Sequence, residues 1–195
     1  MNDLVAYLWA TPNSRRVSIL LEELELPYTV VPVNIRAGEQ FAPSILALNP
    51  FGKLPILSWE SDSTACTLTE SGAILLFFAE HFQQLIPLRE SERRTMLQWL
   101  MTILTGLGPA MGQAHHWLHL SQHRHADAIS HAQAAVHRIY TLLERQLSEQ
   151  TFLSGDYSIV DIAAYPWIER HGWTGLGLAR YPALEAWAGR IADRP

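Results

Sequence analysis

Residues 68–82 read LTESGAILLFFAEHF and place an acid and a hydroxyl directly before an apolar run. The run from Gly72 to Ala79 is apolar on nearly every side, which predicts a helix that is buried on most of its surface. A helix start carries N–H donors and partial positive charge, so it can bind a carboxylate. Glu70 and Ser71 therefore either cap the helix or help to bind a zwitterion, such as the backbone end of an amino acid.

The sequence before this helix mixes strand and helix patterns. Short apolar or β-branched runs predict strands, and apolar residues at intervals of three and four predict helices. Pro32 suggests that the second strand lies at the edge of a sheet. The predicted order begins with a strand at 4–9, a helix containing 17–24, a strand at 28–33 and a short helix at 43–48. A hairpin of 54–59 and 66–68 around Asp62 and Ser63 follows, and the last element is the helix formed by the apolar run described above. This order indicates a small α/β layer.

From residue 89 onward the pattern is helical. One long helix is predicted by an apolar stripe at helical spacing, which comprises Ile129, Ala132, Val136, Ile139, Tyr140, Leu143 and Leu147. Two shorter helices are expected near residues 159–170 and 183–193. A boundary near residues 86–88 therefore separates an α/β domain, residues 1–83, from an all-helical domain, residues 89–195.

Composition narrows the class of protein. The chain has 195 residues, 48% of them hydrophobic, and its formal net charge of -5 gives no electrostatic reason to expect binding to DNA or RNA. No apolar stretch reaches the roughly 18–20 residues needed to span a membrane, and the first residues lack the positive charge of a secretory signal. Cys66 is the single cysteine, so no internal disulfide is possible. We expect a globular cytoplasmic protein that binds neither membranes nor nucleic acid.

A second stretch, NPFGKLPIL at residues 49–57, places a proline where a strand is expected to begin. Pro55 removes one hydrogen-bond donor from the sheet, and its peptide bond with Leu54 is either trans, as the base rate favours, or cis. A cis bond would leave the backbone N–H and C=O of Leu54 able to pair with an extended peptide.

The third stretch is the polar turn between the first strand and the first helix, TPNSRR at residues 11–16. Ligands of α/β proteins often bind beyond the carboxyl ends of the strands, where this turn would lie. Asn13 or Ser14 could equally be the N-cap of the helix. Arg15 and Arg16 are expected to be solvated on that helix, although one of them could serve an ion pair near a ligand.

These three stretches, in this order, resemble a thioredoxin-like fold, and the helical domain after them makes the whole chain similar to a cytosolic glutathione transferase. The segment YSIVD at 157–161, with Ser158 as N-cap and Asp161 at the third helical position, is similar to a capped helix in the helical domain of these enzymes. The turn TPN at 11–13 and the segment GEQF at 38–41 look closest to the bacterial Nu class and its Ure2-like relatives. The resemblance implies a glutathione-binding α/β domain. The helical domain would then supply the second-substrate site and part of a dimer interface.

The resemblance also implies how glutathione binds. Glu70 would receive the ammonium of the γ-glutamyl group, and Ser71 with the helix start would receive the adjacent carboxylate. Leu54 would pair backbone to backbone with the cysteinyl unit, beside a cis-Pro55. The glycine end would be held by two further residues, Lys53 and Gln40.

The reactive atom would be the glutathione sulfur. A thiol has a pKa of about 8.5 and attacks as its thiolate, so hydrogen-bond donors beside the sulfur favour the reactive form. The turn at 11–16 contains no cysteine, so a cysteine-dependent, glutaredoxin-like mechanism fits poorly. By resemblance to the Nu class, Thr11 and Asn13 would face the sulfur, with Ser14 as the next hydroxyl. That class is known for disulfide reduction by glutathione through thiol–disulfide exchange.

The partners implied by the resemblance are glutathione, used as a substrate or co-substrate, a small electrophile or disulfide, and a second copy of the chain in a homodimer. The alternative is a transferase-like binding or regulatory module without turnover, because a fold alone does not establish catalysis. His115 and His119 lie one helical turn apart and could bind a metal, but no acidic or cysteine ligand accompanies them, and we expect no metal.

Overall fold

The computed structural model describes residues 2–61 and 64–194, so the predicted hairpin turn at Asp62 and Ser63 lies outside the described residues. The chain divides into two compact units, Met1–Gln84 and Leu85–Pro195. No helix among the described residues is long and apolar enough to cross a membrane.

The first unit contains a four-stranded sheet in the order β2-β1-β3-β4. β1 is parallel to β2 and antiparallel to β3, which pairs with β4 in a hairpin. The strands are β1 at Asn2–Leu8, β2 at Thr29–Pro32, β3 at Ile56–Ser61 and β4 at Thr64–Thr69. β2 lies at the edge, where its proline does not interrupt the interior of the sheet. The edge position predicted from Pro32 is therefore confirmed.

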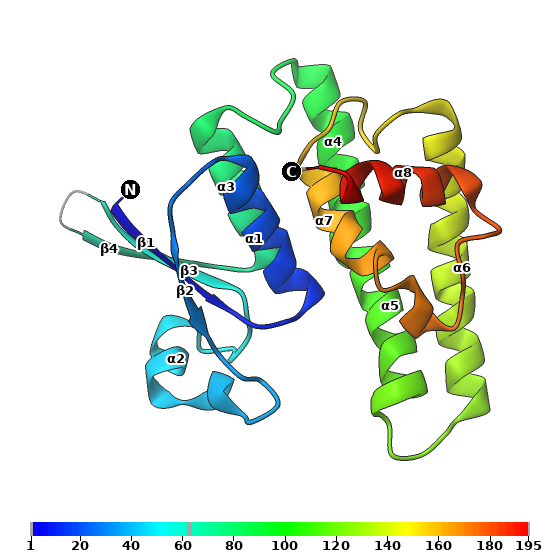
Figure 1. The fold of residues 1–195 in the computed structure, drawn as a ribbon, viewed down its shortest axis with the longest axis horizontal. Helices are drawn as coiled ribbons and strands as arrows, with labels where there is room; N and C mark the ends of the chain where they lie inside the picture. Colours follow the sequence, from blue (N-terminus) through cyan, green and yellow to red (C-terminus); the bar gives the residue numbers. More distant parts are fainter. Residues whose placement is uncertain (1, 62–63, 195) are drawn as a thin grey trace. The chain divides into compact units, whose positions relative to one another are not determined.

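Helices cover both faces of this sheet. They are α1 at Pro12–Glu23, the 3₁₀ helix η1 at Glu39–Phe41, α2 at Pro43–Leu48 and α3 at Ser71–Phe82. α1 and α3 lie side by side on one face, and α2 lies on the other (Figure 1). The buried side chains of Ile74, Leu75 and Phe78 show that α3 is packed deep in the unit, as its apolar sequence predicts. This is the predicted thioredoxin-like arrangement.

The second unit is built from helices. They are α4 at Glu90–Thr102, the π-helical segments η2 at Ile103–Leu107 and η3 at His116–Leu120 on either side of α5 at Gly108–His115, α6 at Ala126–Glu149, α7 at Ile159–Ile168, the 3₁₀ helix η4 at His171–Thr174, and α8 at Pro182–Ala192. Six of the seven residues in the predicted stripe on α6 are buried, and they are Ile129, Ala132, Val136, Tyr140, Leu143 and Leu147.

The start of α7 carries the predicted capping box. Ser158 accepts a hydrogen bond from the N–H of Val160, and the Asp161 carboxylate accepts one from the N–H of Ser158 at 3.1 Å. Asp161 is fully buried and also accepts from the N–H of Leu153 and the indole of Trp187. Three N–H donors on one buried carboxylate tie α7 to α8 and to the preceding loop, which supports the predicted structural role of this acid.

Candidate active site

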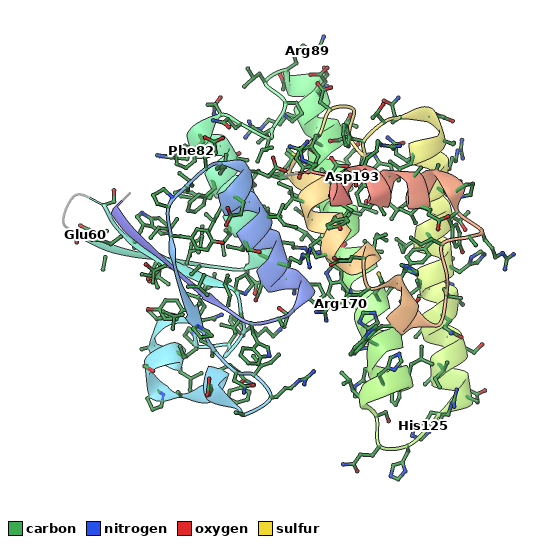
Figure 2. The ribbon with its side chains drawn as sticks, in the orientation of Figure 1. Glu60, Phe82, Arg89, His125, Arg170 and Asp193 are labelled. Carbon is green, nitrogen blue, oxygen red and sulfur yellow. The ribbon has the colours of Figure 1, made fainter. Side chains whose placement is uncertain are left out.

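The register of the sheet brings the predicted site segments together. Tyr7, near the end of β1, pairs with Ile56 at the start of β3, and Ile56 pairs with Thr69 at the end of β4. β2 runs parallel to β1, so it ends at the same edge. Glu60 marks the opposite end of β3, at the left of Figure 2. The segments at the first end contain all the predicted glutathione-site residues, namely Thr11, Asn13, Ser14, Gln40, Lys53, Leu54, Pro55, Glu70 and Ser71.

The turn after β1 is organised by its hydroxyl groups. Thr11 is the N-cap of α1, because its Oγ1 accepts from the N–H of Ser14 at 3.2 Å. The alternative in which Asn13 or Ser14 is the N-cap is therefore wrong. The Ser14 oxygen accepts in turn from the Thr11 hydroxyl at 3.1 Å and from the N–H of Trp9 at 3.3 Å. Ser14 is only 2% exposed, whereas Thr11 and Asn13 are partly exposed. Thr11 and Asn13 are therefore more accessible to a ligand than Ser14 is.

Arg16 departs from the sequence-based expectation. Arg15 is exposed as predicted, but Arg16 is 3% exposed. One nitrogen of its guanidinium, Nη1, donates to Oδ1 of Asn13 at 2.9 Å and to Oγ of Ser71 at 3.1 Å. Burial lowers the pKa of Arg16 to about 10, so the side chain is still a cation at neutral pH. The only sequence signal for this contact is the spacing of three residues between Asn13 and Arg16, which places them on one helix face.

The start of α3 shows whether Glu70 and Ser71 cap the helix with their side chains. Ser71 is the first residue of the helix and is 5% exposed. Glu70 occupies the N-cap position, but its side chain makes no capping hydrogen bond and is exposed. Its backbone has φ +66° and ψ 111°, a conformation that residues other than glycine rarely adopt. Neither side chain therefore acts as a simple side-chain cap.

The loop before β3 is held by a buried amide. Asn49 is 2% exposed, and its Nδ2 donates to the carbonyl of Lys53 at 2.9 Å while its Oδ1 accepts from the N–H of Phe51 at 3.1 Å. The peptide bond between Leu54 and Pro55 is cis, as the resemblance implied. The loop therefore ends with Leu54 and Pro55, and β3 begins at the next residue, Ile56.

Gln40 and Lys53 come from segments that touch. Gly52 has φ +57°, and a Cβ there would lie 2.8 Å from the ring of Phe41 and 3.3 Å from the carbonyl oxygen of Gln40. Only glycine allows η1 to pack this closely on the loop. Lys53 is exposed, and Oε1 of Gln40 is buried without a hydrogen-bond partner among the described residues.

In the helical unit, the two histidines considered as metal ligands are held by aromatic side chains. His115 is 7% exposed, with its ring 5.8 Å from that of Trp167 and 5.7 Å from that of Trp173. Burial, together with the charges of Arg170 and His119, lowers the pKa of His115 to about 4. His119 bonds through Nε2 to the carbonyl of Trp173 at 3.0 Å. Within residues 2–61 and 64–194, no group of three or more His, Cys, Asp or Glu side chains is arranged to hold a metal ion.

The chain matches two known families over most of its length. The family described as Glutathione S-transferase, N-terminal domain, matches residues 10–81, and the family described as Glutathione S-transferase, C-terminal domain, matches residues 97–195. This chain belongs to the glutathione S-transferase family. The resemblance predicted from the three stretches is therefore confirmed.

Individual relatives refine this placement. The Disulfide-bond oxidoreductase YfcG of Escherichia coli (strain K12) is 38% identical over 195 residues, which cover 97% of this chain and 90% of that protein. A glutathione transferase of Burkholderia graminis with two glutathione molecules bound per subunit superposes with a TM-score of 0.92, at 30% identity over 100% of this chain and 85% of that chain. The glutathione transferase URE2P6 of Phanerochaete chrysosporium, in complex with oxidized glutathione, gives a TM-score of 0.91 at 29% identity, over 100% of this chain and 92% of that one.

Proposed function

We propose that this glutathione S-transferase binds glutathione at the first unit's sheet end and activates its thiol for attack on an electrophile or for reduction of a disulfide. The observation that carries the proposal is the sheet register, which gathers a carboxylate, a helix start with a hydroxyl, and an amide-bearing turn at one end. A tripeptide zwitterion with a thiol is matched by these groups: the carboxylate can bind its ammonium, the helix start its carboxylate, and the amide its thiolate.

The γ-glutamyl end of glutathione is assigned to the start of α3. Glu70 is exposed and is not used as a cap, so its carboxylate can accept from an ammonium group. Ser71 and the first N–H groups of α3 can donate to the neighbouring carboxylate, where the helix dipole adds to the attraction. The two charged groups of an amino-acid end thus meet complementary groups on adjacent residues.

The sulfur is assigned to the turn that begins α1. The Asn13 amide would donate toward the thiolate, and buried Ser14 would hold the turn in place. The Thr11 hydroxyl, whose single hydrogen is donated to Ser14 in this structure, would turn from Ser14 to the sulfur to become the second donor. Each tenfold gain in thiolate requires about 1.4 kcal/mol of preferential stabilisation. Two donors of charge-assisted strength, at roughly 1.5–3 kcal/mol each, are sufficient to move a thiol pKa of about 8.5 toward neutrality.

The remaining contacts would hold the rest of the tripeptide. Leu54, next to cis-Pro55, would pair its backbone with the cysteinyl unit. Lys53 and Gln40 would bind the glycine carboxylate, since both lie on segments in contact through Gly52. Holding the peptide at both ends fixes the position of the sulfur, which lowers the entropic part of the barrier to reaction.

Disulfide reduction needs no cysteine in the protein. A bound glutathione thiolate attacks the substrate disulfide and releases one thiol, and a second glutathione thiolate resolves the mixed disulfide and releases the other. Two glutathione thiols are oxidised to glutathione disulfide, and their protons pass to the two product thiols. The name of the E. coli relative and the two bound glutathiones of the Burkholderia structure support this chemistry.

The test is a titration of tryptophan fluorescence with reduced glutathione and, separately, with its disulfide, because Trp9 lies beside the turn. We expect saturable binding of both. Disulfide reduction and thiol conjugation are then assayed with the same protein. Binding of neither ligand would overturn the proposal, and binding without turnover would leave a glutathione-binding module. Light scattering in solution tests the homodimer that we also propose from the family.

A further inference from the structure

One buried guanidinium joins the two parts of the site that would bind opposite ends of the γ-glutamylcysteine unit. We infer that Arg16 is a positioning residue that orients the Asn13 amide toward the sulfur and the Ser71 hydroxyl toward the γ-glutamyl carboxylate. The inference rests on the proposed function, because it concerns how that same site is prepared for glutathione. Its basis is the pair of contacts from Nη1, to Asn13 on α1 and to Ser71 on α3, 55 residues apart in sequence.

The chemistry of the guanidinium determines the direction of both neighbours. Arginine has five N–H donors and no acceptor, so the part of Asn13 that faces it must be the carbonyl oxygen. The amide nitrogen, with its two hydrogens, is thereby turned the other way. Ser71 likewise accepts through its oxygen, so its own hydrogen must point to a different partner. Arg16 thus converts two groups that could accept or donate into donors toward the ligand.

The two contacts also share one nitrogen. Nη1 carries two hydrogens, and Asn13 and Ser71 each take one. A movement of the guanidinium toward one acceptor therefore weakens its bond to the other. Because Arg16 is 3% exposed, water cannot easily replace a lost partner. The sulfur end and the carboxylate end of the site are consequently coupled through Arg16.

Its charge acts in the same direction as its hydrogen bonds. A buried cation behind Asn13 and Ser71 favours the anionic form of groups that bind in front of them, here a thiolate and a carboxylate. Lysine at this position would keep the charge but lose the planar pair of donors, and methionine would lose both while keeping an unbranched apolar chain. These two replacements separate the contribution of charge from that of geometry.

The experiment compares Arg16→Met and Arg16→Lys with the wild type, using Arg15→Met as the control on the exposed neighbour. Dissociation constants are measured for glutathione and for S-methylglutathione, which lacks an ionisable thiol. The pKa of bound glutathione is read from the ultraviolet absorbance of its thiolate. We expect Arg16→Met to weaken S-methylglutathione binding about tenfold and to raise the bound thiol's pKa toward the free value of about 8.5, with partial recovery in Arg16→Lys.

A purely structural role gives a different result. An Arg16→Met protein that folds and shows the wild-type thiol pKa and affinities would overturn the inference while leaving the proposed function intact. If Arg16→Met does not fold, Arg16→Lys decides: an unchanged thiol pKa and unchanged affinity for S-methylglutathione overturn the inference. If the wild type binds no glutathione, the proposed function fails, and the inference fails with it.

Discussion

Glu70 adopts a backbone conformation that favours glycine, so its replacement by glycine should stabilise the fold while weakening ligand binding. The residue has φ +66° and ψ 111°. Holding a residue other than glycine in such a region costs roughly 1–3 kcal/mol. Glycine removes that cost but loses roughly 0.5–1 kcal/mol because its unfolded chain is more flexible. We therefore expect Glu70→Gly to gain about 1 kcal/mol, which corresponds to a rise of roughly 2–4 °C in Tm for a chain of this size.

The matched control is Glu70→Gln, which keeps the strained backbone and the side-chain length but removes the charge. Its Tm should stay close to that of the wild type, because Glu70 is exposed and makes no capping bond. Both variants should bind glutathione at least about tenfold more weakly, since each loses a charge-assisted acceptor for the ammonium. Thermal unfolding and glutathione titration are measured on all three proteins. Equal Tm values for Glu70→Gly and Glu70→Gln would show that the backbone stores no strain. Unchanged affinity in both would remove Glu70 from the site.

Three further variants test other parts of the structure. Ser71→Ala should weaken glutathione binding by about 1 kcal/mol or more in a direct titration, and unchanged affinity would remove Ser71 from the site. Asp161→Ala leaves buried N–H donors without an acceptor and should cost roughly 3 kcal/mol in urea unfolding, whereas an unmoved midpoint would contradict the role of the capping box. The pKa of His115 is about 4 in the folded protein and 6.5 ordinarily, so the unfolded chain binds more protons between these values and stability falls as the pH is lowered through them. The Tm of the wild type should therefore fall relative to that of His115→Phe from about pH 6.5 to pH 4. Burial raises the pKa of Asp161 to about 6, which acts in the opposite direction, but this contribution is common to both proteins and cancels in the comparison. A constant difference would contradict the lowered pKa of His115.

Elements that rest on local pattern could be predicted from sequence. α2 occupies Pro43–Leu48 as predicted, with proline in the first turn, where its missing N–H is not needed. The edge position of β2 followed from Pro32, because a proline inside the sheet would remove a ladder hydrogen bond. The capping box at Ser158 and Asp161 followed from three-residue spacing. In each case the deciding interaction lies within a few residues of the pattern.

Features set by packing between distant segments could not be predicted in this way. Arginine is usually exposed, and nothing in the local sequence distinguishes Arg16 from Arg15 as the one that is buried. The contact of Arg16 with Ser71 exists only because α1 and α3 pack together. His115 is likewise buried by Trp167 and Trp173, more than 50 residues away along the chain. The positive φ of Glu70 was also missed, because an acidic residue before a helix usually indicates a side-chain cap.

Positive φ at residues other than glycine also occurs elsewhere in the first unit, at Asp3, Glu25 and Gln83, but three unfavourable features of different kinds lie at one end of the sheet. Arg16 is a buried cation, Glu70 holds a glycine-like backbone, and Gln40 keeps a buried oxygen without a partner among the described residues. Each is unfavourable for folding alone, and the sheet register places all three at the same end. Stability alone selects against such features, so the presence of three of them at one end of the sheet supports the proposal that a ligand binds there. Glutathione offers the complementary groups that we propose: an ammonium for Glu70, anions in front of Arg16, and the glycine end for Gln40. The residues whose conformation or burial could not be predicted from local sequence therefore give the strongest structural support for the proposed site.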